Sequence, residues 1–538
     1  MNWVKRESFV RINKKDTIKQ QIAKIRGIQD IDTFLNPPES AVHSPYLLKN
    51  IEEAAERIIR ALQNGERIAV SADVDADGVT STAILIRYLR QFTDNVYYTY
   101  HQRGAGHGIE NQIKMIDKDT KLIVVLDSST NSTEACMSLQ KRGYDVIIAD
   151  HHGYERENPY ALIVNPQLDD SPNKALSGAA VTYKLIQVID DRLGTGTTED
   201  FLDLVAVGLV ADIMDMSVME NRYLVKEGLK NINNTGLLAI LTNAKADMDA
   251  LSSTTIGFTI APMLNGVARM DRIELALELL VEDDFDKCKK LVKEMVKVND
   301  ERKAKEKSLT EMYEDQINPE DKVLIVVGTD PSKSFNGLVA QKIAQKYKRP
   351  TLVVRDSGKE VAGSFRSFND FKIRTYLQNT PLVKTAVGHE YAGGVTILTE
   401  NLPELRAKIN SDLADEEFKA IVEFDLEFEG KDITLDLVEQ LQEINRITGN
   451  GFEKVKVKIN NLMVEERIVM GKNNDAIKIK TDCLDAIRFR EDSEYASDLG
   501  MFDIMSLVGE LNINKYFNWK FRKEIVSIQA FLDDYQLD

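Results

Sequence analysis

Aspartate and histidine residues follow short apolar segments at three points in the first part of the chain. The residues are Asp73, Asp75 and Asp77 in one loop, then Asp127, then Asp150-His151-His152. Carboxylate oxygens and imidazole nitrogens are ligands of divalent cations, and two such cations side by side cleave phosphate esters. If the apolar segments are strands of one parallel sheet, their carboxyl ends bring these side chains to one edge. The spacing therefore favours a metal-dependent phosphoesterase.

Each of these features also has a purely structural explanation. An Asp-rich loop can bind calcium, and an Asp after a strand commonly caps the next helix. Two adjacent histidines after a buried strand, among only six in the chain, are hard to explain by packing. Asp212 lies inside the predicted apolar helix Leu202–Met216, where a charge is costly unless it is paired or binds a metal. The structural alternative for Asp212 is a salt bridge with Arg222 or Lys184.

Strand and helix patterns alternate between residue 66 and about residue 215. The predicted strands cover residues 67–71, 95–100, 122–127, 145–149 and 161–165. This alternation is typical of a doubly wound parallel sheet. The predicted fold class is therefore α/β, with the sheet at the centre of a catalytic domain at residues 66–283.

Four further segments complete the predicted organisation. Residues 1–65 form an N-terminal helical segment, and residues 284–316 form one long connector helix with a polar far half. Residues 320–412 alternate again and predict a smaller α/β domain. Residues 418–538 are rich in alternating strands and predict a small β-barrel.

Charge and cysteine content narrow the class of protein. The net charge of −17 argues against nonspecific coating of nucleic acid, so a nucleic-acid enzyme of this charge must gather its cations in a groove. Cys136, Cys288 and Cys483 lack CxxC spacing, which argues against disulfides or a zinc ribbon and fits a reducing cytoplasm. The chain has no apolar signal segment and no run of 18 apolar residues, so we expect no membrane span.

The chain resembles the RecJ-type single-stranded-DNA exonucleases of the DHH phosphoesterase superfamily over nearly its full length. The resemblance rests on the acidic loop, Asp127, the Asp-His-His sequence and several other segments. These are Arg26-Gly27-Ile28, Phe34-Leu35-Asn36-Pro37, Asn165-Pro166, Leu202–Gly208 running to Asp212, Glu220-Asn221-Arg222, and Ala261-Pro262-x-Leu264-Asn265 with Arg269. The resemblance implies a DHH domain, a connector helix, a DHH-associated domain and a C-terminal OB-like barrel.

The resemblance also implies roles for the acidic residues and histidines. Two Mn²⁺ or Mg²⁺ ions would be held by Asp75, Asp77, Asp127, His151 and Asp212. Asp127 would bridge the two ions and Asp150 would support His151. His152 would face the scissile phosphate.

Two positions depart from the pattern of the family. Ser71 stands where many relatives have a histidine, so Asp73 is included as a metal ligand or as support for one. Ser128-Ser129 replaces the usual Asn-Gly after Asp127, which leaves the geometry of that turn open.

By the same resemblance, residues outside the metal site are expected to bind the DNA. Ser364 and Arg366 with Arg269 would hold the 5′-phosphate end, and His389 would reach the cleaved phosphate. The glycine-rich segment with Gly388, Gly393 and Gly394 would let the backbone approach phosphate. Arg103 would contact the DNA backbone, and His107 would stack on a base or fill a turn.

The segment Lys515–Lys523 interleaves aromatic and cationic residues and includes Trp519. One explanation is a barrel strand with its aromatic face in the core. The other is a stacking platform for single-stranded DNA, as in OB folds. The resemblance favours DNA binding by this domain without assigning it to particular residues.

The leading prediction is a 5′→3′ exonuclease that hydrolyses single-stranded DNA to 5′-mononucleotides in DNA repair and recombination. Candidate protein partners are a single-stranded-DNA-binding protein or a helicase. The first alternative is a DHH oligoribonuclease or cyclic-dinucleotide phosphodiesterase, although such enzymes generally lack the barrel tail. The second alternative is a non-catalytic replication scaffold, against which the retained metal ligands speak.

Overall fold

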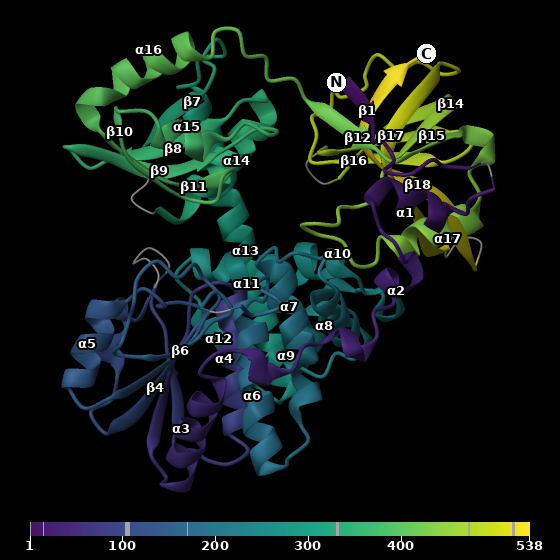
Figure 1. Cartoon of the computed structure of the whole chain (residues 1–538). Helices are drawn as coiled ribbons and strands as arrows, with labels where there is room; N and C mark the ends of the chain where they lie inside the picture. The colour runs from purple at the N-terminus through teal and green to yellow at the C-terminus, as the bar shows by residue number, and fades with distance from the viewer. Residues whose placement is uncertain are drawn as a thin grey trace. The chain divides into compact units, whose positions relative to one another are not determined.

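The computed structural model describes residues 2–13, 15–102, 108–168, 170–329, 333–471, 474–518 and 522–538. The chain forms two compact units, Val42–Phe418 and Met1–Ala41 together with Lys419–Asp538 (Figure 1). We call them the two-sheet unit and the barrel unit, and each is described by itself. Arg103, His107 and Trp519 lie outside the described residues. None of the helices in the described ranges is long and apolar enough to cross a membrane.

A five-stranded parallel sheet forms the core of the first part of the two-sheet unit (Figure 1). Its strands are β2 (Arg67–Ser71), β3 (Val96–Thr99), β4 (Thr120–Leu126), β5 (Asp145–Ala149) and β6 (Leu162–Val164). Their order, β3-β2-β4-β5-β6, confirms the doubly wound arrangement predicted from the sequence. The chain adds β3 on one side of β2 and β4 on the other. Ligands of such sheets bind where the strand order reverses, here beyond the ends of β2 and β4.

Helices bury the strands of this sheet. The helices are α3 (Ile51–Gln63), α4 (Ala76–Leu89), α5 (Thr133–Lys141) and α6 (Gly178–Leu193). Cys136 and Leu139 of α5 pack with Ile123, Val125 and Ile148 of the strands. The alternate strand residues are buried as well, and α3, α4 and α6 contact β2, β4, β5 and β6. A sheet that helices cover on both faces needs strands that are apolar along nearly their whole length.

A group of helices follows the sheet along the chain. They are α7 (Leu202–Ala211), α8 (Met219–Lys230), α9 (Thr235–Ala244), α10 (Ser253–Thr255), a π-helical segment η8 (Ile256–Ile260), α11 (Ala261–Arg269), α12 (Glu274–Val281) and α13 (Phe285–Glu314). The 30-residue helix α13 occupies the segment for which the sequence predicts a connector. Its far half is not polar on all sides, because Leu309 and Tyr313 are buried and pack against the second sheet.

The second sheet of this unit is mixed. Its strands are β7 (Leu324–Gly328), β8 (Thr351–Asp356), β9 (Glu360–Arg366), β10 (Val383–Gly388) and β11 (Ala392–Leu398), in the order β10-β11-β9-β8-β7. Only β7 and β8 run parallel to each other. The helices are α14 (Asn336–Tyr347), α15 (Ile373–Gln378) and α16 (Leu402–Asp412). Leu352, Phe365 and Ile397 lie in the core of this sheet.

The barrel unit contains both termini of the chain (Figure 1). Its strands are β1 (Asn2–Lys5), β12 (Ile421–Phe424), β13 (Leu426–Glu429), β14 (Val457–Met470), β15 (Ala476–Thr481), β16 (Asp485–Phe489), β17 (Ile504–Asn518) and β18 (Lys523–Leu537). The strands β14, β15, β16, β18 and β17 pair in a ring, since β14 pairs with both β15 and β17. The helices are α1 (Ile18–Arg26), α2 (Ile31–Leu35) and α17 (Leu435–Ile444).

Short 3-10 helices occur at η1 (Glu39–Ala41), η2 (Pro45–Leu47), η4 (Ile109–Asn111), η5 (Ile113–Met115), η6 (Thr198–Phe201), η7 (Met248–Ala250), η9 (Lys333–Phe335), η10 (Thr399–Asn401) and η11 (Gly430–Asp432). Most of them lie in the connections between the longer elements. They shape these connections without forming a layer of the fold.

The first 41 residues belong to the barrel unit, whereas the sequence places them in a helical segment 1–65. β1 pairs in parallel with β12, and Trp3 Nε1 donates a hydrogen bond to Asp534 Oδ2 at 2.8 Å. The guanidinium of Arg26 donates two hydrogen bonds to the carboxylate of Asp425, at 2.8 and 3.0 Å. Asp425 is 1% exposed. The Arg26-Gly27-Ile28 segment therefore ties the start of the chain to the barrel.

Substitution Arg26→Ala should destabilise the barrel unit by about 3 kcal/mol, because it removes both guanidinium hydrogen bonds to the buried carboxylate of Asp425 and leaves only Arg6, 4.0 Å away, as its cation among the described residues. Trp3 and Trp519 are the two tryptophans of the chain, and both belong to this unit, so tryptophan fluorescence during urea unfolding reports on it. Lys19→Ala, which removes a more exposed ion pair with Glu443, is the control and should cost about 1 kcal/mol or less. Equal effects of the two substitutions would contradict the conclusion that the buried pair of Arg26 and Asp425 holds the start of the chain to the barrel.

Candidate metal centre

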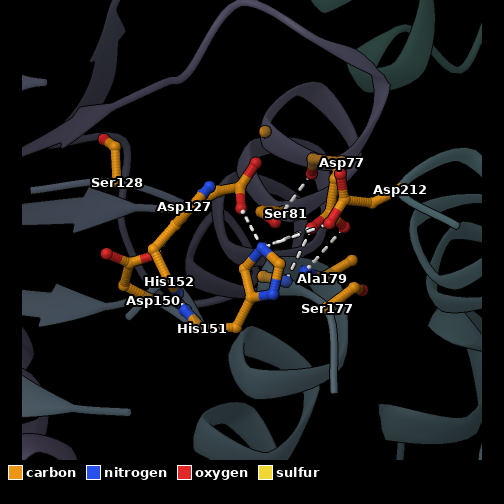
Figure 2. A network of polar contacts seen from close by, with 12 residues as sticks. Asp77, Ser81, Asp127, Ser128, Asp150, His151, His152, Ser177, Ala179 and Asp212 are labelled. Atoms are coloured by element: carbon orange, nitrogen blue, oxygen red, sulfur yellow. Dashed lines mark hydrogen bonds and ion pairs between the residues drawn. The ribbon is translucent and has the colours of Figure 1, made fainter. Parts of the chain in front are cut away.

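The predicted metal-binding residues gather at one edge of the parallel sheet, and Figure 2 shows Asp77, Asp127, His151 and Asp212 among them. Asp73, Asp75 and Asp77 follow β2, Asp127 follows β4, Asp150-His151-His152 follows β5, and Asp212 ends α7. Their position is the point where the strand order reverses, as expected for a ligand site in a sheet of this type.

The imidazole of His151 lies at the centre of the cluster. Its Nε2 atom is 3.2 Å from Asp127 Oδ1, 3.3 Å from Asp212 Oδ2 and 3.9 Å from Asp77 Oδ2. Figure 2 shows the ring between Asp127 on one side and Asp77 and Asp212 on the other. Burial lowers the pKa of His151, which favours the neutral imidazole that a cation needs as a ligand.

Asp77 is held by the start of another helix. It is 1% exposed, and its carboxylate oxygens accept hydrogen bonds from the backbone N–H groups of Gly178 at 2.6 Å and Ala179 at 3.0 Å. These two N–H groups belong to the first turn of α6, whose dipole favours a negative charge there. A Cβ atom on Gly208 of α7 would lie 2.3 Å from Asp77 Oδ1, so only glycine fits at that position.

Asp73, Asp75 and Asp127 form a second group of carboxylates whose oxygens lie within 4.8 Å of one another. Asp75 is the N-cap of α4, and its Oδ1 accepts from the N–H groups of Asp77 and Gly78, both at 3.1 Å. This capping leaves Oδ2 of Asp75 for a cation. The helix α4 thus begins at Ala76, directly after this capping residue.

Asp127 sits in a turn of left-handed backbone. Its φ angle is +57° and that of Ser129 is +77°, although neither residue is glycine. Ser129 Oγ accepts a hydrogen bond from Ile109 N at 2.9 Å, which offsets part of the strain. The replacement of Asn-Gly by Ser128-Ser129 therefore does not prevent the left-handed turn.

Asp150 contacts the ring of His152, whereas the sequence predicts that it supports His151. Its Oδ1 lies 2.7 Å from His152 Nδ1 and accepts from His151 N at 2.7 Å, and its Oδ2 accepts from Thr130 Oγ1 at 2.6 Å. Burial alone would raise the pKa of Asp150, but the hydrogen bonds from His152 and Thr130 hold it well below its usual value.

The contact with Asp150 makes His152 the cationic group of the site. Burial lowers its pKa, but the hydrogen bond and the charge of Asp150 outweigh burial and raise the pKa to about 9. The His152 side chain is 53% exposed. A protonated ring held through Nδ1 presents its other N–H to an anion.

Asp212 does not lie inside a helix as predicted, but caps the C-terminus of α7. Lys184, one of its two suggested partners, instead pairs with the buried Glu220 at 2.6 Å. The other suggested partner, Arg222, donates from Nη1 to Met216 O at 3.1 Å. Burial, together with the charges of Asp77 and Asp75, raises the pKa of Asp212 to about 8.

The segment Glu220-Asn221-Arg222 supports the loop that follows Asp212. Asn221 Nδ2 donates to Asp215 O at 3.0 Å and to Ala175 O, just before α6, at 2.7 Å. Arg222, which is fully buried, reaches Met216 of the same loop. These contacts connect the loop after Asp212 to the segment that leads into the helix holding Asp77.

The donor set suits divalent cations, because it offers carboxylate oxygens and an imidazole nitrogen within a short distance of one another. One ligand group is Asp77, His151 and Asp212, and a second is Asp73, Asp75 and Asp127. A third group overlaps both and consists of Asp127, Asp150, His151 and His152. Asp127 Oδ1 is also 3.2 Å from His151 Nε2, and both atoms are buried without a hydrogen bond among the described residues. Burial raises the pKa of Asp127 well above its usual value, and the negative charges of Asp77 and Asp75 raise it further. Cations would relieve this repulsion.

The residues predicted to hold the 5′ end of DNA lie around the start of α14. Arg269 Nη1 donates to Ser334 O at 2.7 Å, just before this helix. Gly337 in its first turn packs against Arg366, since a Cβ there would be 2.6 Å from Arg366 Nη2. No described acidic residue forms an ion pair with Arg366, whose pKa is lowered by burial. Ser364 lies on β9, two residues before Arg366.

The glycine-rich segment serves mainly to close a β-hairpin. His389 is exposed in the turn between β10 and β11, next to Gly388 with a φ of +110°. A Cβ on Gly393 would lie 2.0 Å from Val387 O, so this glycine permits strand packing. A Cβ on Gly394 would lie 3.7 Å from its nearest described atom. Of these three glycines, only Gly394 therefore leaves room for another group to approach the backbone closely.

The sequence assigned no role at this site to His101, Gln112 or Asn265, although Asn265 belongs to a segment that carries the family resemblance. His101 Nε2 lies 3.8 Å from Asp73 Oδ1, and Gln112 contacts the other nitrogen of its ring. Asn265 Oδ1 accepts from Ala76 N at 3.0 Å, at the start of α4. One signal was present for His101, which comes directly after a predicted strand, as the other site residues do.

Substitution Asp127→Asn should stabilise the metal-free protein and abolish its response to metal. Removing one of several repelling buried carboxylates should raise Tm by about 2 °C or more without cation, while the rise in Tm with Mn²⁺ disappears. Differential scanning calorimetry with and without Mn²⁺ measures both effects. Asp119→Asn, at an exposed carboxylate, is the control. If Mn²⁺ raised the Tm of Asp127→Asn as much as that of the wild type, Asp127 would not be a metal ligand.

Comparison with known proteins gives matches to two family domains and to named relatives. The DHH family N-terminal domain matches residues 67–209, and the RecJ OB domain matches residues 424–523. The SPbeta prophage protein YorK of Bacillus subtilis (strain 168), whose name describes a single-strand DNA-specific exonuclease, is 31% identical over 92% of this chain and 92% of its own length. The single-stranded-DNA-specific exonuclease RecJ of the same organism is 29% identical over 94% of this chain and 66% of its own length.

A solved structure shows the same fold. The crystal structure of RecJ in complex with Mn²⁺ from Thermus thermophilus matches with a TM-score of 0.77 and 24% identity, covering 96% of this chain and 75% of that chain. The parallel sheet, the second sheet and the OB domain of the present chain therefore occur together in a known architecture. With identity above 30% across nearly the whole of a relative, the chain belongs to the RecJ family of DHH phosphoesterases.

Proposed function

We propose that this protein is a metal-dependent 5′→3′ exonuclease that hydrolyses single-stranded DNA to 5′-mononucleotides. The observation that carries the proposal is that two ligand groups lie side by side at the switch point of the sheet, with Asp127 Oδ1 of one 3.2 Å from His151 Nε2 of the other. Relatives named for single-stranded DNA supply the substrate class. A role in DNA repair and recombination, with a single-stranded-DNA-binding protein or a helicase as partner, is part of the proposal and follows from the family alone.

The metal ligands in this proposal are Asp73, Asp75, Asp77, Asp127, His151 and Asp212. Bound Mn²⁺ or Mg²⁺ would supply an activated water and stabilise the leaving 3′ oxygen. The related Thermus thermophilus protein was crystallised with Mn²⁺, which makes this ion the first to test. The protein itself contributes rigid ligand positions, because each acid is fixed by a strand end, a helix end or a backbone N–H group.

His152 is proposed to contact the scissile phosphate. Asp150 holds its Nδ1 atom, and the raised pKa keeps the ring protonated at neutral pH. The exposed side of the ring can then donate a charge-assisted hydrogen bond to a phosphate oxygen. His389, from the turn of the second sheet, is proposed to reach the same phosphate.

The start of α14 is proposed to hold the terminal 5′-phosphate. Backbone N–H groups at a helix start bind phosphate, and Arg366 lies against the first turn without a described acidic partner. Arg269 contacts the segment that leads into this helix, and Ser364 adds a hydroxyl from β9. Selection of a 5′-phosphate by this pocket would make the enzyme start from 5′ ends. Gly388, Gly393 and Gly394 shape the adjacent hairpin.

Single-stranded DNA would also contact parts of the chain beyond these pockets. The barrel unit contains a domain that matches the RecJ OB domain, and OB folds bind single strands by stacking and by cationic grooves. Arg103, His107 and Trp519 remain expected DNA contacts from the sequence.

The direction of cleavage can be tested with internally labelled single-stranded DNA blocked at one end. With Mn²⁺, mononucleotide release should continue when the 3′ end is blocked and stop when the 5′ end is blocked, because entry requires the 5′-phosphate. His151→Ala is the control for contaminating nuclease and should release nothing. Release stopped only by the 3′ block would contradict the direction. Cleavage of dinucleotides without release from long strands would point to a small-nucleotide phosphodiesterase.

Substitution Arg366→Gln should raise KM for 5′-phosphorylated DNA about tenfold, the effect of losing one hydrogen bond to a charged group. KM for 5′-hydroxyl DNA should change much less, and steady-state kinetics on the two substrates gives the ratio. Lys342→Gln is the control, since it removes from α14, against whose first turn Arg366 lies, a positive charge that is already paired with Glu306. An unchanged preference for the 5′-phosphate in Arg366→Gln would place the pocket elsewhere.

A further inference from the structure

A histidine outside the metal-binding clusters lies beside one of the acidic residues. His101 follows β3 and is 3% exposed. Ser71 of β2 pairs with Thr99 of β3, so that His101 and Asp73 occupy matching places two residues beyond these paired positions. The His101 Nε2 atom faces Asp73 Oδ1 at 3.8 Å. The register of the sheet therefore places this imidazole against this carboxylate.

The surrounding hydrogen bonds determine which nitrogen of His101 carries the proton. Gln112 Nε2 donates to Ala72 O at 2.9 Å, and Gln112 Oε1 accepts from Thr99 Oγ1 at 2.6 Å. Because a backbone carbonyl can only accept, the orientation of the Gln112 amide is fixed. Its Nε2 atom is also 3.0 Å from His101 Nδ1. A donor at this distance requires Nδ1 to accept, so the proton of the neutral ring lies on Nε2.

This tautomer rules out direct metal binding through Nε2 and favours a different role. A protonated ring nitrogen has no lone pair for a cation but can donate a hydrogen bond. None of the ligand groups that the described residues form includes His101, whereas Asp73 belongs to the group with Asp75 and Asp127. The separation of 3.8 Å exceeds a hydrogen bond, and a small rotation of the carboxylate would close it.

We propose that His101 is a positioning residue for Asp73, locked in its donor tautomer by Gln112. A hydrogen bond from Nε2 to Oδ1 would turn Oδ2 of Asp73 toward the cation shared with Asp75 and Asp127. This inference rests on the proposed metal-dependent function and adds a specific residue to it. The imidazole from β3 would support the cluster in this chain, in which Ser71 stands at the position where many relatives carry a histidine.

The proposal makes the two cation sites respond differently to one substitution. Partners that orient metal ligands typically change metal affinity 10- to 100-fold. Loss of the His101 donor should therefore weaken the site that contains Asp73 about tenfold. The site formed by Asp77, His151 and Asp212 should keep its affinity, because His101 is absent from its ligand group.

Two nearly isosteric substitutions separate the donor from the packing. Methionine and glutamine reach about as far as the imidazole Nε2, but only glutamine offers an N–H group there. His101→Met should show the tenfold loss at one site, and His101→Gln should retain most of the affinity. In both variants Gln112 keeps its hydrogen bond to Ala72, so the local fold should persist. The Tm of each metal-free variant checks this point.

The experiment is a titration of the full chain with Mn²⁺ alone, followed by calorimetry and by the EPR signal of free Mn²⁺. A tenfold loss at one of two sites in His101→Met, with near-normal binding in His101→Gln, supports the proposal. Adding His101→Met to Asp73→Asn should then cause little further loss, because His101 acts only through the Asp73 carboxylate. Equal behaviour of the Met and Gln variants, or equal weakening of both sites, would overturn it. If the wild type bound no Mn²⁺ at all, the result would instead contradict the proposed metal-dependent function itself.

Discussion

The repulsion among five aspartates at one buried sheet edge is the constraint on which the rest of the structure depends. Burial and neighbouring negative charges raise the pKa values of Asp77, Asp127 and Asp212. Such a cluster is costly in a folded protein unless cations neutralise it. The neutral ring of His151, which lies within 4 Å of three of these carboxylates, completes a ligand set in place of a further charge.

The surrounding fold keeps these acids in place by short-range contacts. The first turn of α6 binds Asp77, the N-cap position of α4 fixes Asp75, and a left-handed turn presents Asp127. Close packing adds to this precision, since glycines at 178 and 208 leave no room for a Cβ beside Asp127 and Asp77. Asp150, in contrast, directs its oxygens to His152 and Thr130 and so prepares a cationic group beside the metal site.

Much of this arrangement could be predicted from local sequence, because strand ends in a parallel sheet must meet at one edge. The strands, the doubly wound order and the grouping of Asp77, Asp127 and His151 follow from that rule. What could not be predicted depends on side-chain direction or on distant partners. The ring that Asp150 contacts is set by backbone geometry, and the ion pair of Arg26 with Asp425 joins opposite ends of the chain. The position of His101 beside Asp73 could not be predicted, because it depends on the register between β2 and β3.

EPR spectroscopy of the full chain titrated with Mn²⁺ tests the central claim most directly, because it reports whether two ions share a ligand. We expect an exchange-coupled pair of Mn²⁺ ions when two equivalents are bound, since Asp127 belongs to one ligand group and its Oδ1 lies 3.2 Å from His151 Nε2 of the other. Two bound ions with uncoupled spectra would contradict the sharing of Asp127, and a single ion at saturation would contradict the two-cation site itself.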